Sequence, residues 1–139
     1  LDMISSQLGS HGIFVEVSNL ETDLTLQGDI IHLEQIIMNL CLNAMHALDK
    51  AEQTDKRIRI ITCQQDKQIC LTIQDNGPGI PEGMNEKLFD PFFSTKKPGE
   101  GMGLGLAIVK QFVDNFKGEI SCHNHENGGA VFEIVLKQT

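Results

Sequence analysis

Apolar and polar residues follow two different periods along this chain of 139 residues. Alternation at every second residue, which is typical of half-buried strands, predicts strands over residues 12–18, 24–29, 56–65, 68–75, 119–124 and 129–137. Apolar residues that recur every three to four positions predict helices from Asp29 to about Lys50 and over 104–117. Residues 1–8 have the pattern of a helix end, which Gly9 would close.

The order of these elements favours an α+β fold. Several strands follow one another as hairpins, and strands and helices do not alternate regularly as they do in a parallel sheet. We therefore expect two layers, a sheet and a set of helices that cover one of its faces. In the last helix, the apolar face should comprise Leu104, Ile108, Phe112 and Phe116. Gly118 should end the helix.

Composition narrows the class of protein. The length suits one domain with a hydrophobic core, and no apolar run approaches the roughly 20 residues of a membrane span. A net charge of −8 with 11 basic residues disfavours binding to nucleic acid. The chain lacks a signal peptide and does not begin with Met, so we interpret residues 1–139 as one domain of a longer protein.

The four cysteines form no CxxC pair and lie in apolar or strand-like runs, which is typical of reduced packing residues. Cys122 lies close to His123 and His125, but no fourth zinc ligand is suitably spaced. We therefore interpret this segment as a polar hairpin.

A polar stripe runs along the helix that we expect from Asp29 to Lys50. On a helical wheel, His32, Gln35, Asn43 and His46 fall within about 40° of Asn39, whereas the apolar residues lie on the opposite side. A solvated helix face is the ordinary explanation, but Asn is a poor helix former with a short side chain. A carboxamide oxygen can ligate Mg²⁺ only weakly, so phosphates would have to supply further ligands. The apolar side comprises Leu33, Ile37, Leu40, Ala44 and Leu48.

Two glycine-containing segments offer complementary chemistry. "DNGPGI" (75–80) directly follows a strand, so that Asp75 could accept a hydrogen bond from an exocyclic amine, although the same residues also suit an ordinary turn. "GMGLGL" (101–106) opens a helix, where free backbone amides favour a phosphate. No strand precedes it, which argues against a dinucleotide-binding βαβ unit. All four prolines lie within the long irregular segment 76–103, which is typical of a functional loop or lid.

Four ordered motifs, "NLCLNA", "DNGPGI", "LFDPFFSTK" and "GMGLGLAIV", resemble the N, G1, F and G2 boxes of the catalytic, ATP-binding domain of two-component sensor histidine kinases. These kinases belong to the superfamily of gyrase, Hsp90, histidine kinase and mismatch-repair ATPases. The resemblance covers nearly the whole chain. It implies a Bergerat-type fold, with a mixed, mostly antiparallel sheet covered by helices on one face, and ATP and Mg²⁺ as cofactors.

The resemblance also implies roles for single residues. Asn43 would ligate Mg²⁺, Asn39 would contact phosphate or support that site, and His46 would lie near the phosphates. Asp75 would accept a hydrogen bond from the adenine amino group. Gly77 and Gly79 would shape the base pocket. The lid would be anchored by Phe89, Phe92 and Phe93. The residues that would approach the phosphates are Lys96, Lys97, Gly101, Met102, Gly103, Leu104 and Gly105. Phe89 could equally be a packing residue of the core.

Two departures from related sequences bear on activity. Family members often have Thr where this chain has Ala130, so a hydroxyl contact near adenine would be lost. Hydrolases of the superfamily resemble one another in placing a Glu four residues before the metal-binding Asn, where this chain has Asn39. Without that carboxylate, hydrolysis is disfavoured, whereas a histidine acceptor is already a nucleophile.

The resemblance therefore implies a histidine kinase domain that donates the γ-phosphate of ATP to a histidine. That histidine would lie on a separate dimerisation domain, for relay to an aspartate of a response regulator. The full-length protein would be a homodimer whose kinase domain is cytoplasmic and makes no membrane contact, with a parent that could be an inner-membrane sensor. The alternative is a nucleotide-sensing module that signals through lid ordering without transfer.

Overall fold

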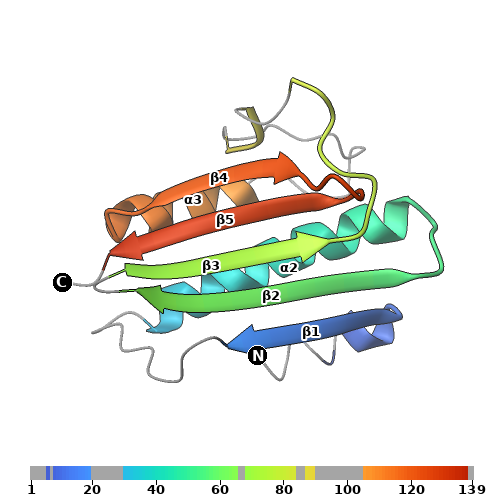
Figure 1. Cartoon of the computed structure of the whole chain (residues 1–139), viewed down its shortest axis with the longest axis horizontal. Helices are drawn as coiled ribbons and strands as arrows, with labels where there is room; N and C mark the ends of the chain where they lie inside the picture. The colour runs from blue at the N-terminus through green and yellow to red at the C-terminus, as the bar shows by residue number, and fades with distance from the viewer. Residues whose placement is uncertain are drawn as a thin grey trace.

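A computed structural model gives the fold for residues 6, 8–19, 30–65, 68–83, 87–89 and 105–137. A five-stranded sheet forms one layer, and the helices lie together behind it (Figure 1). The expected two-layer α+β fold is confirmed. In chain order the elements are β1 (Ile13–Asn19), α2 (Ile30–Lys50), β2 (Lys56–Gln65), β3 (Gln68–Asp75), the 3-10 helix η1 (Lys87–Phe89), α3 (Gly105–Asn115), β4 (Glu119–Asn124) and β5 (Ala130–Lys137).

The strand order across the sheet is β1-β2-β3-β5-β4. β1 pairs with β2 in parallel, as the intervening helix α2 allows, and the other three pairings are antiparallel. The sheet is thus mixed and mostly antiparallel, as expected. The predicted hairpin of β2 and β3 is confirmed, with Ile58 opposite Asp75 at the end where β3 stops. The strand predicted over 24–29 lies outside the described residues.

The core fills the space between the sheet and the helices. Ile37, Leu40, Ala44 and Leu48 of α2 are all buried, which confirms the apolar face predicted for that helix. Cys41 is also fully buried, and this burial raises the pKa of its thiol to about 11, as suits a packing residue. Inward-facing residues of the central strands complete the core, among them Ile58, Ile60, Ile69, Leu71, Ile73, Ile134 and Leu136.

The buried face of α3 differs from the one expected. Its fully buried residues are Val109 and Val113, with Leu106 next, whereas Ile108 is 39% exposed. Phe112 and Phe116 are only partly buried against the core. The apolar arc of this helix runs over about 160°, from Ile108 to Leu106, with polar residues opposite, and periodicity alone did not select the part of this arc that meets the sheet.

The end of α3 also corrects a prediction. The residue in the left-handed conformation is Lys117, with φ 55°, and not Gly118. The Lys117 N–H donates to the Asp114 carbonyl and the Gly118 N–H to the Val113 carbonyl, both at 2.9 Å, which is the Schellman arrangement. Gly118 is needed for a different reason, because a Cβ there would collide with the Val135 carbonyl of β5. At the other end of the chain, Gly9 does not close the first helix, which continues through Ser10.

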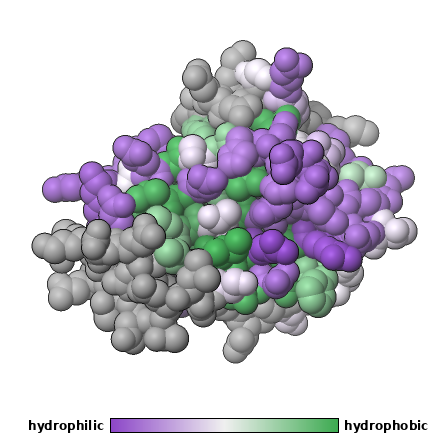
Figure 2. Space-filling view, viewed as in Figure 1, coloured by the Kyte–Doolittle hydropathy of each residue, from purple (hydrophilic) through white to green (hydrophobic). Residues whose placement is uncertain are grey.

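The sheet face opposite the helices is open. Figure 2 shows this face, with hydrophilic side chains around a smaller apolar area. Phe14 of the edge strand β1 is 66% exposed there, beside Arg57 in the neighbouring strand. None of the helices in the described part of the chain is long and apolar enough to cross a membrane.

Candidate functional site

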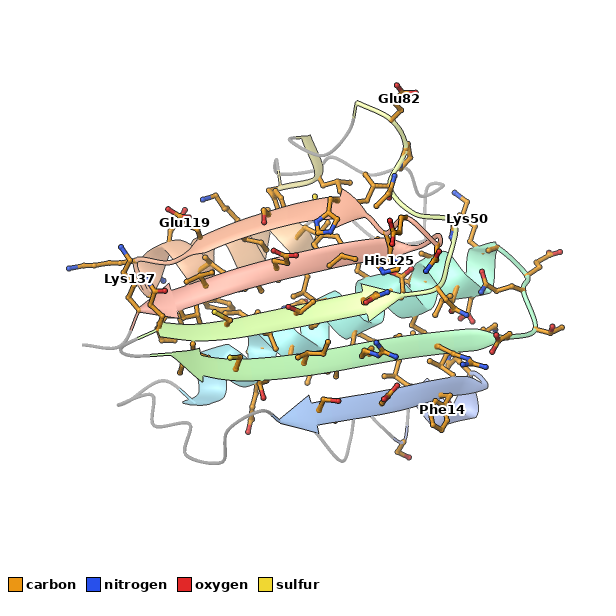
Figure 3. All side chains as sticks on the ribbon, viewed as in Figure 1. Phe14, Lys50, Glu82, Glu119, His125 and Lys137 are labelled. Atoms are coloured by element: carbon orange, nitrogen blue, oxygen red, sulfur yellow. The ribbon has the colours of Figure 1, made fainter. Side chains whose placement is uncertain are left out.

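A cavity of about 870 Å³ lies beside the C-terminal half of α2. It is bounded by α2, by the segment that follows β3, by η1 and by the start of β5. Figure 3 shows Lys50 of α2 and His125 of the turn between β4 and β5 at this same end of the molecule. The lining residues are Asn43, His46, Ala47, Asp49, Lys50, Ala51, Asp75, Pro78, Gly79, Ile80, Pro81, Leu88, Ala130 and Phe132.

Asp75 ends β3 and is only 6% exposed. Its Oδ1 accepts the Gly77 N–H at 2.8 Å and the Ala130 N–H at 3.3 Å. Burial raises the pKa of this carboxyl, and the two backbone hydrogen bonds lower it. The effect of burial is larger, so the pKa of Asp75 lies above its usual value. Within the described part of the chain, both hydrogen bonds to this carboxyl end on Oδ1, which leaves Oδ2 as an acceptor for a ligand in the cavity that Asp75 lines.

One face of α2 supplies a wall of the cavity. Asn43, His46, Ala47 and Lys50 line the cavity, at the spacing of three and four residues that one face of a helix presents. Asn43 is half-buried and His46 is exposed. Asn39, one turn earlier, is not among the lining residues, and its Nδ2 donates to the Gln35 carbonyl of its own helix at 2.9 Å. The cavity thus brings together Asn43, His46, Asp75 and Gly79 of the predicted residues, but Asn39 and Gly77 do not line it.

The segment after β3 is held at both of its ends. At the first end, the Asn76 side chain accepts the Arg57 N–H at 2.7 Å and donates to the Asp55 carbonyl at 3.0 Å. At the second end, the Asn124 side chain accepts the Ile80 N–H at 2.6 Å and donates to the Ile80 carbonyl at 3.0 Å. The Gly79–Ile80 stretch of the cavity wall is therefore attached to β4.

Glycines allow the close approach of these segments. A Cβ at Gly77 would lie 3.1 Å from Asp75 Oδ1, the atom to which its own N–H donates. Gly129 has a φ of 97°, and a Cβ there would collide with the Asp75 carbonyl. The close packing of Gly129 on Asp75 lets the N–H of the next residue, Ala130 at the start of β5, donate to the Asp75 carboxylate.

Apolar side chains form the remaining wall. Ile80 and Phe132 are buried, and Leu88 of η1 is half-buried. Phe89 packs edge to face against Phe132, with ring centroids 6.4 Å apart, so Phe89 joins η1 to the core. Of the expected lid residues, Phe92, Phe93, Lys96 and Lys97 lie outside the described part of the chain. Gly101, Met102, Gly103 and Leu104 also lie outside it, while Gly105 is the first residue of α3.

Asp49, which lines the cavity, belongs to an ion cluster. Asp49 contacts His11 Nδ1 at 2.6 Å and Lys56 Nζ at 2.9 Å, and Lys56 also donates to the His11 carbonyl at 3.2 Å. Partial burial raises the pKa of Asp49, but Lys56 and His11 lower it more, so the net pKa lies below the usual value. The cluster ties the turn before β1 to the end of α2 and to the start of β2.

Among the residues of the site that sequence reasoning missed are Asn124, Ile80, Leu88 and Phe132. Phe132 and Ile80 carried only the ordinary signal of core residues. Asn124 belongs to "CHNHENGG", which we interpreted as a polar hairpin. Its contact with Ile80 joins residues 44 positions apart, and no local pattern reveals such a pair.

Comparison with known proteins places this chain in a family. The profile of the family described as histidine kinase-, DNA gyrase B-, and HSP90-like ATPase matches residues 28–139. The chain belongs to this family. Its relatives include the two-component sensor PprA of Pseudomonas aeruginosa, which is 34% identical over 139 residues, and the histidine kinase AtoS of Escherichia coli, which is 35% identical over 122 residues.

The likeness extends to solved structures. The catalytic domain of histidine kinase ThkA has a TM-score of 0.84 and 29% identity over 99% of this chain and 87% of that chain. The mycobacterial sensor histidine kinase MprB has a TM-score of 0.80 and 29% identity over 98% and 90%. The homologues are thus sensor histidine kinases. The matches cover 98% of this chain but 15% of PprA, and 86% of this chain but 19% of AtoS, so the chain spans only a small part of these relatives.

Proposed function

We propose that this chain binds Mg²⁺ and ATP in the cavity beside α2 and presents the γ-phosphate to a histidine on another domain. The observation that carries the proposal is the carboxylate of Asp75. It is buried, held through one oxygen by two backbone amides, and shares the cavity with Asn43 and His46 of α2. A cavity of about 870 Å³ also lies within the roughly 300–1,000 Å³ that is usual for sites of small molecules and cofactors.

Asp75 would recognise the base. An ionised carboxylate only accepts hydrogen bonds, so Oδ2 suits the amino group of adenine and repels the carbonyl oxygen that guanine carries at the same position. Ile80 and Phe132 supply buried apolar surface for the ring. We expect the Asp75 carboxylate to remain fixed during binding, because the Gly77 and Ala130 amides hold Oδ1.

Asn43 would be the protein ligand of Mg²⁺. Its carboxamide oxygen is a hard ligand, and the half-buried side chain lies in the cavity wall. A single neutral oxygen is too weak a donor set to hold the ion alone, so the donor set fits an ion that arrives with phosphate oxygens. When bound, Mg²⁺ would neutralise charge on the phosphates. His46, on the next turn of α2, would lie near them.

The absence of a carboxylate at position 39 favours phosphoryl transfer to a histidine over hydrolysis of ATP. The position of the superfamily's general base is Asn39, whose carboxamide has no titratable oxygen and donates to its own helix. Asn39 would therefore support the site and would not activate water. An imidazole acceptor needs no such base, since a neutral ring nitrogen already is a nucleophile.

We further propose that residues 1–139 act as one catalytic domain of a longer homodimeric protein. Its dimerisation domain would carry the acceptor histidine, and its partner would be a response regulator. One structural neighbour is titled histidine kinase ThkA in complex with response regulator protein TrrA, with 26% identity over 99% of this chain and 38% of that chain. We also propose that this is a cytoplasmic kinase domain in a sensor of the inner membrane. Two of its relatives are named C4-dicarboxylate transport sensor proteins.

The test is phosphotransfer from ATP labelled in its γ-phosphate. The chain is mixed with the purified dimerisation domain of its own protein, with Mg²⁺, and label on the histidine of that domain is measured. We expect the wild type to transfer label and the Asp75→Asn variant, at an ATP concentration below saturation, to transfer about tenfold to a hundredfold less. If the chain binds ATP but no label reaches the histidine, transfer is contradicted and the alternative of a nucleotide-sensing module holds.

A further inference from the structure

We propose that Asn124 is a positioning residue of the nucleotide site: it fixes the Gly79–Ile80 stretch in the arrangement that receives the base. The inference deepens the proposed function and rests on it. Asn124 is the last residue of β4 and does not line the cavity. It acts through Ile80, which does.

The contact uses both polar groups of one residue's backbone. The Ile80 N–H donates to Asn124 Oδ1 at 2.6 Å, and Asn124 Nδ2 donates to the Ile80 carbonyl at 3.0 Å. A single carboxamide thus offers Ile80 the donor and the acceptor that a neighbouring strand would offer. A hydroxyl or carboxylate side chain cannot donate and accept with this separation of its atoms.

The neighbouring glycine shows how closely the two segments meet. Gly79 has a φ of 86°, and a Cβ at this position would lie 2.7 Å from Asn124 Oδ1. The backbone at residue 79 is therefore pressed against the carboxamide, in a conformation that side chains disfavour. Because Gly79 and Ile80 both line the cavity, the contact fixes a part of its wall.

The same turn also positions Asp75. Asn124 is the register partner of Ala130, whose N–H donates to Asp75 Oδ1. The hairpin of β4 and β5 therefore holds the carboxylate from one strand and the apolar wall from the other. A ligand between Asp75 and Ile80 would depend on their separation, and Asn124 and Ala130 set that separation as a pair.

The experiment compares nucleotide binding by the wild type, Asn124→Ala and Asn124→Asp. We expect Asn124→Ala to weaken the binding of ATP, ADP and adenosine by about the same factor, on the order of tenfold. Without the contact, the Gly79–Ile80 stretch would be in its binding arrangement only part of the time. Asn124→Asp keeps the acceptor but turns an anionic oxygen toward the Ile80 carbonyl in place of the Nδ2 donor, so we expect it to weaken binding at least as much as Asn124→Ala. The control is Asn127→Ala, since Asn127 enters the same turn through its backbone N–H.

Amide hydrogen exchange separates positioning from general destabilisation. In Asn124→Ala without nucleotide, we expect faster exchange at the Ile80 amide with an unchanged midpoint of thermal unfolding. Wild-type binding strength in Asn124→Ala, or equal weakening in Asn127→Ala, would overturn the inference. A wild-type chain that binds no adenine nucleotide would instead contradict the proposed function, while the exchange at Ile80 would still report on the contact itself.

Discussion

At the scale of single residues, the chemistry of the site depends on Asp75. Few carboxylates are as buried as this one, which is 6% exposed, and burial raises its pKa. A raised pKa means that the ionised form of Asp75 lowers the stability of the fold. The protonated form contributes stability that is complete only below the pKa of Asp75 in the unfolded chain and is lost as the pH rises through its pKa in the fold. The carboxylate thus opposes folding at neutral pH, which is typical of a group that serves binding.

Asp75→Asn should therefore separate binding from stability. The carboxamide oxygen can still accept the Gly77 and Ala130 amides, but its NH₂ group meets the amino group of adenine. We expect ATP binding at pH 7 to weaken by about tenfold to a hundredfold, the range for a hydrogen bond to a charged group, with an equal or higher midpoint of thermal unfolding.

Calorimetric titration and thermal unfolding measure the two effects of Asp75→Asn. Glu119→Gln, a change at an exposed carboxylate of β4, is the control for lost negative charge. Unchanged ATP affinity in Asp75→Asn would remove Asp75 from the site.

Asn43→Ala tests the metal assignment. Without this carboxamide, Mg²⁺ should no longer strengthen ATP binding, whereas binding measured without Mg²⁺ should change little. Titrations with ATP in the presence and absence of Mg²⁺ give the comparison. If Mg²⁺ strengthens binding equally in the wild type and in the variant, Asn43 is not the ligand.

At the scale of elements, most helices and strands of the described residues were predictable, whereas of the strand pairings only that of β2 with β3 was. The two faces of α2 follow from its periodicity, and the hairpin of β2 and β3 follows from alternation. In contrast, α3 has an apolar arc of about 160° that includes Ile108 as well as Val109 and Val113, and only packing against the sheet determines that the two valines are buried while Ile108 is exposed. Asp75 was predictable as an acceptor, but its contact with Ala130 spans 55 positions and depends on strand pairing.

The C-terminal end of α3 gives a prediction for stability. Lys117→Gly should raise the free energy of unfolding by about 0.5–1 kcal/mol, since Gly accepts the left-handed conformation without steric cost. Gly118→Ala should lower it by more than about 1 kcal/mol, because a Cβ meets the Val135 carbonyl.

Urea unfolding of the two α3 variants measures these changes. Opposite signs are expected at adjacent positions. A destabilised Lys117→Gly variant would show that the lysine side chain, and not its backbone conformation, matters at this position.

At the scale of the whole molecule, the cluster of Asp49, His11 and Lys56 ties the N-terminal part of the chain to the main core. Because the pKa of Asp49 is lowered in the fold, its contribution is present above the pKa of the unfolded chain and is lost as the pH falls through the folded pKa. Asp49→Asn should therefore lower the midpoint of thermal unfolding at pH 7, and the difference should shrink in acid, below the usual range for Asp.

Thermal unfolding across pH checks the Asp49→Asn prediction. The control is Asp55→Asn, since Asp55 pairs with Arg57 at an exposed position where both side chains are about two-thirds exposed. A difference between Asp49→Asn and the wild type that stays constant with pH would contradict the assigned contacts.

The overall architecture places the two sheet faces in different roles. One face packs on the helices and forms the core beside the cavity, and the other is open, with polar side chains around a small apolar area (Figure 2). Ordered motifs in the sequence predicted the fold and four of the residues that line the cavity, Asn43, His46, Asp75 and Gly79. Asn124 and the wall of Ile80, Leu88 and Phe132 come together only when the hairpin of β4 and β5 meets the segment after β3.

The central claim is that adenine nucleotide binds between Asp75 and α2. An isotopically labelled chain titrated with ATP and Mg²⁺ tests it by the shifts of assigned amide signals. We predict saturable shifts at Gly77, Ile80 and Ala130, with much weaker ones when GTP replaces ATP. Shifts confined to the open sheet face, around Arg59 and Glu133, or an equal response to GTP, would contradict the account.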